Sequence, residues 1–325
     1  MIDADKFKEE LQVQEHAFNA RLKEIKYEWK SDSIKTEGRF FYLSFKNGEP
    51  TIDEFIEYLY SRLINFCIPV KEQIKAKQLF LETDDYRHIV DMNDKARDLF
   101  VKSKKLQEAS GEPGELITFI LLEEAIGAPQ VACKMYLKTN RNMQVYGSDG
   151  IHLYYDKEED MLKVIWGESK IYDQLSMALD KICESISSFR GETSEVNGRE
   201  RDIQILKDHL SVKNKELEEA ILKYFDPYEE ESNKVIDCHA CFVGFDYAEL
   251  KKLEKLGKEE REKYFSEKYL ERIKSACNLF EDKIKKHSIH HLEYIFFLIP
   301  FKDVNELREK FYRKLGISGD GEVSK

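Results

Sequence analysis

The sequence has 325 residues, which is long enough for about two domains and for at least one full hydrophobic core. Hydrophobic residues make up 42% and charged residues 35%, and Gly and Pro are scarce, so the composition favours long solvated helices over a disordered chain. The 63 acidic residues outnumber the 52 basic ones, which gives a net charge of −11. The surface as a whole therefore cannot be the basic footprint of a stand-alone nucleic-acid-binding protein.

The N-terminal region begins with an acidic amphipathic segment that lacks the apolar core of a signal peptide. The longest apolar stretch, residues 294–301, is far shorter than the ~20 residues of a membrane span. We therefore expect a cytoplasmic protein with no membrane association. In that compartment the six scattered cysteines are expected to be free thiols that serve as small apolar residues.

Residues 40–45 predict a short strand, and residues 46–48 a turn. Thr51 and Glu54 have capping-box spacing, and the apolar periodicity after them predicts a helix that ends before Pro69. Helical patterns continue to about residue 105. Because no chemical motif occurs here, residues 1–108 are expected to form a mostly helical N-terminal region that serves packing or partner contact.

The character of the sequence changes after the break at residues 109–114. Residues 115–126 predict an apolar helix closed by Gly127 and Pro129. Three strands are expected next, at residues 131–137, 150–155 and 162–167. Residues 175–189 then carry the i, i+3, i+4, i+7 apolar spacing of a helix with one buried face.

The C-terminal part predicts a second alternation of helices and strands. A surface linker at 190–201 precedes a helical segment to about residue 225, and two strong strands are expected at 235–245 and 292–299. Helices are expected at 247–286 and 304–315. The order predicts an α/β fold with a mixed central sheet flanked by helices over residues 109–318, followed by a disordered tail at 319–325.

Two carboxylates stand out in the hairpin formed by the second and third of these strands. If the turn at 156–161 is symmetric, the register places Asp149 opposite Glu168, and period 2 places Lys170 on the same face as Glu168. Alternating apolar residues continue that face along both strands. They are Ile151, Leu153, Tyr155, Leu162, Val164 and Trp166.

Two opposed carboxylates repel each other and therefore favour a bound cation. Mg²⁺ often takes one or two protein carboxylates and fills its remaining positions with water and substrate phosphate. A lysine beside them can stabilise charge on a phosphoryl transition state. From spacing alone, however, a turn aspartate at 149 and an exposed Glu168–Lys170 ion pair explain the same residues.

Other polar residues have weaker patterns. Lys134, Lys138 and Arg141 form a local basic cluster that suits DNA phosphate contacts, although solvated surface charges explain it equally well. Cys238 and Cys241 have zinc-ligand spacing, but residues three apart in a strand point to opposite faces and no second such pair exists. We therefore expect no zinc.

Several segments together resemble a known family. Gly114-Glu115 at a helix start and the segment Lys134-Met135-Tyr136-Leu137-Lys138-Thr139 belong to this set. So do Arg141-Asn142-Met143, Gly147-Ser148-Asp149-Gly150-Ile151-His152 and Trp166-Gly167-Glu168-Ser169-Lys170. In this order they closely resemble the HamA nuclease subunit of the Hachiman anti-phage defence system, a family of the PD-(D/E)xK restriction-endonuclease-like superfamily. The resemblance is densest over residues 111–180.

The resemblance implies roles for four residues. Asp149 matches the metal-binding aspartate of the superfamily, Glu168 the second acidic ligand and Lys170 the catalytic lysine. Glu115 matches an acidic residue that assists metal or water positioning, although an acid is also favourable in any first helical turn. Ser148 stands where the motif name has proline, which makes the signature less specific.

The resemblance also implies a restriction-endonuclease-like fold and a function. It suggests a Mg²⁺-dependent deoxyribonuclease, in which Mn²⁺ can substitute, that is controlled by a HamB-type superfamily 2 DNA helicase and its ATP. Two other functions stay open on the sequence. One is a non-catalytic subunit that docks on a helicase and senses its state, and the other is an RNA-cleaving toxin.

Overall fold

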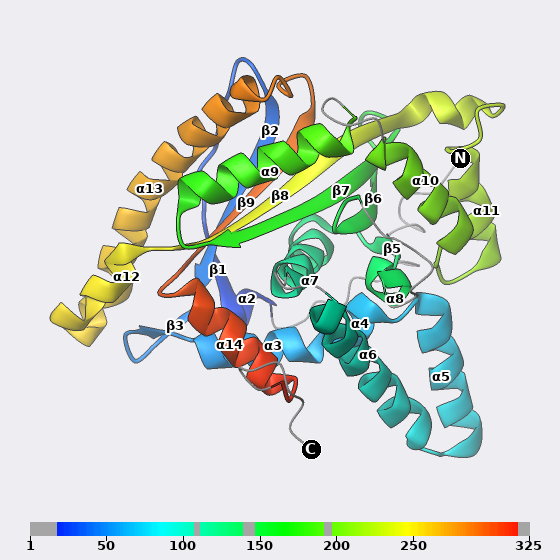
Figure 1. Ribbon diagram of the computed structural model, residues 1–325, viewed down its shortest axis with the longest axis horizontal. Coiled ribbons are helices and arrows are strands. Elements are labelled where there is room, and N and C mark those ends of the chain that lie inside the picture. Colours follow the sequence, from blue (N-terminus) through cyan, green and yellow to red (C-terminus); the bar gives the residue numbers. More distant parts are fainter. Residues whose placement is uncertain (1–17, 107–110, 139–146, 192–196, 318–325) are drawn as a thin grey trace. The chain divides into compact units, whose positions relative to one another are not determined.

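The computed structural model describes residues 18–106, 111–138, 147–191 and 197–317 (Figure 1). A mixed seven-stranded sheet has the order β1-β2-β9-β8-β7-β6-β5. Its strands are β1 (Leu22–Ile25), β2 (Lys35–Leu43), β5 (Gln130–Ala132), β6 (Gly150–Asp156), β7 (Met161–Tyr172), β8 (Val235–Asp246) and β9 (Glu293–Phe301). The predicted α/β class is confirmed, and the mixed sheet flanked by helices is consistent with a restriction-endonuclease-like fold.

The chain forms two compact units made of interleaved segments. The described part of the first unit comprises residues 61–106, 111–138, 147–167, 189–191 and 197–238, and that of the second comprises residues 18–60, 168–188 and 239–317. This division differs from the expected boundary near residue 108. Its physical reason is that β2 pairs in parallel with β9, which joins the N-terminal strands to the C-terminal part of the chain.

The second unit is built around aromatic packing on one face of its strands. Phe40 of β2 and Phe296 of β9 belong to an apolar cluster with residues of α9 and α13, and the Phe280 and Phe296 ring centroids lie 4.6 Å apart. Figure 1 shows α9 and α13 on the same side of these strands. The helices of this unit are α2 (Phe18–Arg21), α3 (Ile52–Ser61), α9 (Leu175–Phe189), α12 (Ala248–Lys252), the 3₁₀ helix η3 (Leu253–Lys255), α13 (Lys258–Lys286) and α14 (Val304–Lys314), and β3 (Phe45–Lys46) pairs with β4 (Glu49–Pro50).

The first unit contains the predicted hairpin. The alternating apolar residues of β6 and β7, from Ile151 to Trp166, are buried in one cluster with residues of α10 and α11, as their period of 2 predicted. The helices of this unit are α4 (Leu63–Cys67), α5 (Val70–Thr83), α6 (Arg87–Leu106), α7 (Glu112–Ile120), the π-helical turn η1 (Leu121–Ile126), α8 (Lys134–Lys138), α10 (Gly198–His209), α11 (Lys215–Lys223) and the 3₁₀ helix η2 (Glu230–Lys234).

The prediction of a strand over residues 131–137 was wrong in most of its length. β5 ends at Ala132, and α8 begins at Lys134. A short apolar run fits a buried strand and a buried helical turn equally well, so periodicity could not separate them.

Candidate functional site

The β6–β7 pairing fixes the position of Asp149 along the hairpin. The register runs from Asp156 opposite Met161 to Gly150 opposite Gly167, which is the register that the symmetric turn predicted. The paired register ends at Gly150 and Gly167, and the backbone N–H of Asp149 donates to the carbonyl of Gly167 at 2.7 Å, one residue before Glu168, which the register predicted opposite Asp149. The Asp149 side chain is partly exposed. An acidic group therefore stands at the start of a rigid, buried hairpin.

Glu168 and Lys170 lie on β7, which continues to Tyr172. Lys170 Nζ donates to Glu168 Oε1 at 2.5 Å, so the two side chains share a face of the strand as predicted. The Glu168 side chain is 11% exposed and that of Lys170 is 23% exposed. A partly buried ammonium is therefore held beside a nearly buried carboxylate on regular β structure, and not on a flexible loop.

Glu115 lies in the first unit, in the N-terminal half of α7, and is 7% exposed. Its backbone N–H donates to the carbonyl of Gly111. Thr118, three residues later on the same helix face, packs so closely on the hairpin that a Cβ built on Gly167 would lie 3.3 Å from its methyl carbon. Gly167 thus allows α7 to approach the strand pair that precedes Glu168.

Lys134 has a different environment from the one expected of a DNA contact. Its side chain is 1% exposed, and Nζ lies 2.9 and 3.0 Å from the two carboxylate oxygens of Asp202. Nζ also donates to the main-chain carbonyl of Ser148 at 2.5 Å. The Lys134 ammonium is therefore buried and paired inside the molecule and does not face solvent. The side chain of Lys138 and all of Arg141 lie outside the described residues.

Asp202 is the functional candidate that the sequence did not single out. It lies on α10 and is fully buried among apolar neighbours on the helix, such as Ile205 and Leu206. Its carboxylate accepts a bond from the Ser148 N–H at 3.0 Å and from the Ser148 hydroxyl at 2.6 Å. The sequence feature that could have identified Asp202 is its place on the apolar face of an amphipathic helix. An aspartate is unusual there unless its charge is paired.

A comparison with family models decides the classification. The HamA model matches residues 16–315, which is nearly the whole chain. The chain belongs to the HamA family. It is therefore a HamA-type protein, associated with the Hachiman defence system. No curated protein matches the chain.

Two titratable groups of the HamA-type chain are buried near the hairpin. Burial lowers the pKa of His152, on β6, to about 4, although its Nδ1 lies 2.8 Å from the Ala128 carbonyl, which opposes the shift. The ring is therefore neutral at pH 7, and Nδ1 donates to that carbonyl. Burial raises the pKa of Glu123, on η1, to about 7, against the opposing charge of Arg62.

The donor chemistry of the predicted site suits Mg²⁺. Asp149 and Glu168 offer carboxylate oxygens, the hard ligands that Mg²⁺ prefers, and Mg²⁺ needs only one or two of them from the protein. Within the described ranges, no group of three or more His, Cys, Asp or Glu side chains is arranged to hold a metal ion. The carboxylates of Asp149 and Glu168 are donors of the kind that Mg²⁺ takes together with water and substrate oxygens.

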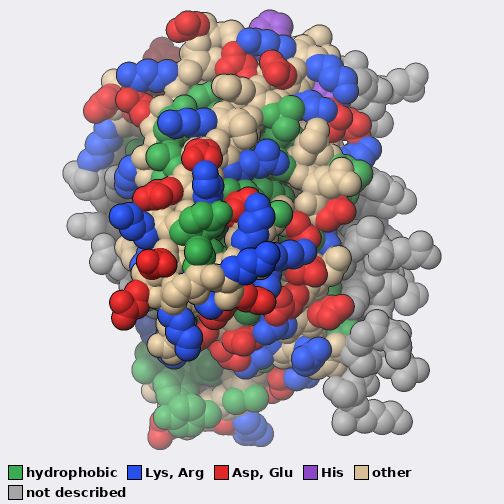
Figure 2. Space-filling view, turned by 90° about the vertical axis from the view of Figure 1, so that its left-hand side faces the viewer, with side chains coloured by type: hydrophobic (Ala, Val, Ile, Leu, Met, Phe, Trp, Pro, Cys, Tyr) green, Lys and Arg blue, Asp and Glu red, His purple; other side chains and the backbone are tan. Residues whose placement is uncertain are grey.

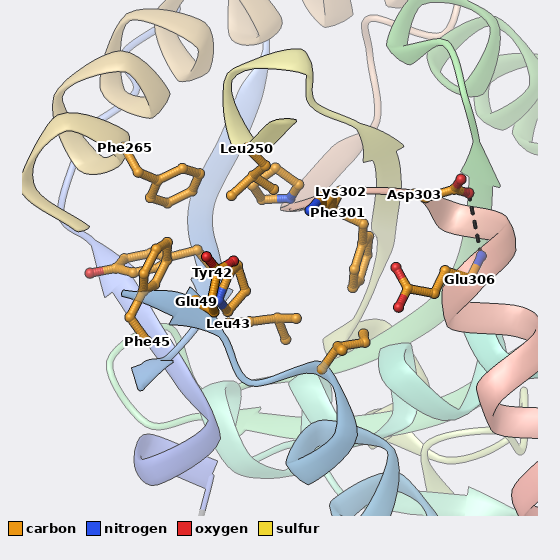
Figure 3. Close-up of a pocket in the computed structure, with 13 residues that line it drawn as sticks. Tyr42, Leu43, Phe45, Glu49, Leu250, Phe265, Phe301, Lys302, Asp303 and Glu306 are labelled. Carbon is orange, nitrogen blue, oxygen red and sulfur yellow. Dashed lines mark hydrogen bonds between the residues drawn. The ribbon is translucent and has the colours of Figure 1, made fainter. Parts of the chain in front are cut away.

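A separate pocket of about 170 Å³ lies in the second unit (Figure 3). Its floor is aromatic and aliphatic, with Tyr42, Phe265 and Phe301 among its lining residues. Acidic and basic groups at its rim are already engaged, since Glu49 pairs with Arg261 and Lys302 with Glu254 at 2.7 Å. The pocket includes none of the predicted site residues.

The surface charge of this HamA-type chain is mixed. Figure 2 shows basic and acidic side chains interspersed over one face. Many are paired, as in Lys268 with Glu271 and Lys285 with Glu281 along α13. No helix in the described part of the chain is long and apolar enough to cross a membrane.

Proposed function

We propose that this HamA-type chain is a metal-dependent DNA nuclease, the effector subunit of the Hachiman complex. The observation that carries the proposal is the Lys170 ammonium, held 2.5 Å from Glu168 Oε1 on β7. The hairpin register supports it, because β6 and β7 pair as predicted up to Gly150 and Gly167, the residues next to Asp149 and Glu168. This arrangement fits the acidic and lysine positions of the PD-(D/E)xK pattern.

The proposed chemistry is hydrolysis of a phosphodiester. Asp149 and Glu168 would hold Mg²⁺, with Glu115 assisting. When bound, the ion supplies charge neutralisation at the scissile phosphate and activates the attacking water. Lys170 would donate to a phosphoryl oxygen and stabilise the negative charge that grows in the transition state. Glu168 also orients the Lys170 ammonium through the bond between them.

We further propose that the chain depends on a HamB-type superfamily 2 DNA helicase that uses ATP. The net charge of −11 gives no overall attraction for DNA, and the face in Figure 2 intermixes both signs of charge. A partner that holds the duplex would supply the missing attraction. Lys138 and Arg141 would then contact DNA phosphates.

The second candidate is a non-catalytic subunit that docks on the helicase. It is favoured by the observation that the described residues include no preformed group of three metal-ligating side chains. The two candidates differ in one measurable property, because a docking subunit does not need Asp149-dependent metal binding.

Calorimetric titration of the purified chain with Mn²⁺ tests the proposal. We expect binding that weakens at least about 10-fold in Asp149→Ala. Asp156→Ala is the matched control, because Asp156 is a carboxylate at the far end of β6, where it pairs with Lys163 at the turn end of the hairpin. Equal binding by the wild type and Asp149→Ala, or no binding by either, would favour the docking subunit. Parallel assays on DNA and RNA identify the substrate.

A further inference from the structure

The turn that precedes Asp149 is held by a buried ion pair. Lys134 of α8 is 1% exposed and Asp202 of α10 is fully buried, and Nζ contacts both oxygens of the carboxylate. Within unit 1 these two helices are separate in sequence from the hairpin. The pair therefore joins three segments of the chain at one point.

Both main-chain polar groups of Ser148 are bonded to this pair. Its carbonyl accepts from Lys134 Nζ at 2.5 Å, and its N–H donates to Asp202 Oδ2 at 3.0 Å. The Ser148 hydroxyl also donates to Asp202 Oδ2 at 2.6 Å. Charged side chains thus fix both peptide groups that flank Ser148, and the second of these leads directly into Asp149.

Gly147 allows the backbone before Ser148 to lie close to the Asp202 carboxylate. Its φ of +129° lies in a region that other residues rarely adopt. A Cβ at this position would lie 2.5 Å from Asp202 Oδ1. The backbone therefore passes directly over the carboxylate, and the Asp149 N–H that follows donates to the carbonyl of Gly167 at the end of the β6–β7 pairing.

We infer that Lys134 and Asp202 are positioning residues that hold the Gly147–Ser148 turn and so direct the Asp149 carboxylate. This inference rests on the proposed function, since Asp149 is the proposed metal ligand. A buried ion pair is seldom needed for stability alone, because apolar residues of similar size often replace one without loss. The hydrogen bonds of the Lys134–Asp202 pair to Ser148, the residue before Asp149, give the pair a role besides stability. Groups that orient a ligand commonly change metal affinity 10- to 100-fold when they are removed.

The main test replaces both charges at once, with Lys134→Met and Asp202→Leu in the same chain. This double variant leaves no buried charge unpaired, so we expect it to fold, with a thermal stability lowered by the lost partners of the buried Ser148 N–H and carbonyl. It removes both bonds to the Ser148 backbone. We expect the Mn²⁺ dissociation constant to rise at least about 10-fold. Hydrogen exchange at the Ser148 amide should also become faster, and this readout requires no metal.

Two further variants separate positioning from stability. Arg199→Met is the matched control, since Arg199 also lies on α10 but pairs with Asp237, which keeps Arg190 as a second partner. It should leave both the Ser148 exchange rate and the Mn²⁺ affinity unchanged. Gly147→Ala displaces the turn without altering either charge. It should weaken Mn²⁺ binding as the double variant does, and it serves as the main test if that variant does not fold.

Each outcome bears on the inference. Wild-type Mn²⁺ affinity in the folded double variant or in Gly147→Ala would overturn it, even if exchange at Ser148 were faster. Equal loss of affinity in Arg199→Met would also overturn it, because the effect would then come from α10 as a whole. If the wild type shows no Asp149-dependent binding, the proposed function fails and the inference with it. Weaker metal binding in the variants is thus distinguished from an absent metal site.

Discussion

At the scale of single residues, Lys170 carries the proposed chemistry. Its removal leaves the strand intact but takes away the donor that would stabilise the transition state, so Lys170→Ala should lower DNA hydrolysis by about 10²–10³-fold. The rate of plasmid degradation by the reconstituted complex measures this. Ser169→Ala is the control, because Ser169 lies between Glu168 and Lys170 on β7 and points to the other face. Full activity in Lys170→Ala would refute the assignment.

His152 gives a second prediction at this scale. Its pKa of about 4 in the folded chain lies below the ordinary value of 6.5, so the unfolded chain binds a proton that the folded chain does not. The contribution to stability is present above pH 6.5 and is lost as the pH falls towards 4, by up to about 3 kcal/mol. Urea denaturation at several pH values measures the free energy of unfolding. In His152→Gln this free energy should fall less as the pH is lowered from 6.5 to 4 than it does in the wild type.

The control for this prediction is His209→Gln, because His209 is exposed in the last turn of α10. It should lose stability in acid as the wild type does. If the free energy of unfolding of His152→Gln fell as steeply with decreasing pH as that of the wild type, the buried His152 ring would not be the cause of the decrease.

Residue-level prediction worked where neighbours in sequence are neighbours in space. Glu168 and Lys170 are two residues apart on one strand, so period 2 was enough to place them together. The Lys134–Asp202 pair spans 68 residues and three segments, and no local pattern reports such a contact. The sequence pattern therefore suggests a DNA phosphate contact or a solvated charge at Lys134, and it gives no indication of Asp202 as its partner.

At the scale of elements, the end of η1 provides a test of local backbone geometry. Gly127 has φ of +76° at the C-cap, and a Cβ there would meet nothing within 4 Å. Gly127→Ala should therefore cost about 1 kcal/mol of unfolding free energy through backbone strain alone. Chemical denaturation measures it. Gly127→Asn should cost less, because Asn tolerates this conformation better, and an equal or larger loss would contradict the account.

The extent of β7 shows why the elements were only partly predictable. The strand was expected to end at Gly167, because the polar residues after it are typical of a strand end. In the structure it continues to Tyr172, so Glu168 and Lys170 lie within regular β structure. Charged residues inside a strand break the apolar pattern on which strand prediction depends. The same pattern was ambiguous for α8, where a short apolar run was interpreted as a strand.

At the scale of the whole molecule, sheet order could not be obtained from local pattern. β2 lies beside β9, at the other end of the sequence, and this parallel pairing makes the N-terminal strands part of the central sheet. The sequence contains the strand of residues 40–45 but no sign of its partner. The α/β fold class could be predicted from the alternation of helices and strands along the chain. The pairing of β2 with β9 depends on contacts between distant segments, which local patterns do not report.

The charge balance leads to a prediction about partners. A chain with a net charge of −11 should bind DNA weakly by itself, so its DNA degradation should be at least about tenfold slower without the helicase and ATP than with them. Comparing the two rates at one salt concentration checks this. Equally fast degradation by the chain alone would show that no partner is needed to deliver DNA.

The central claim is that this HamA-type chain hydrolyses DNA with a metal held by Asp149 and Glu168. The most direct measurement is plasmid degradation by the chain together with its helicase, ATP and Mg²⁺, compared with the same complex carrying Glu168→Ala. We predict rapid degradation by the wild-type complex, none after chelation of the metal, and none by a folded Glu168→Ala complex. Degradation by the Glu168→Ala complex at the wild-type rate would contradict the account.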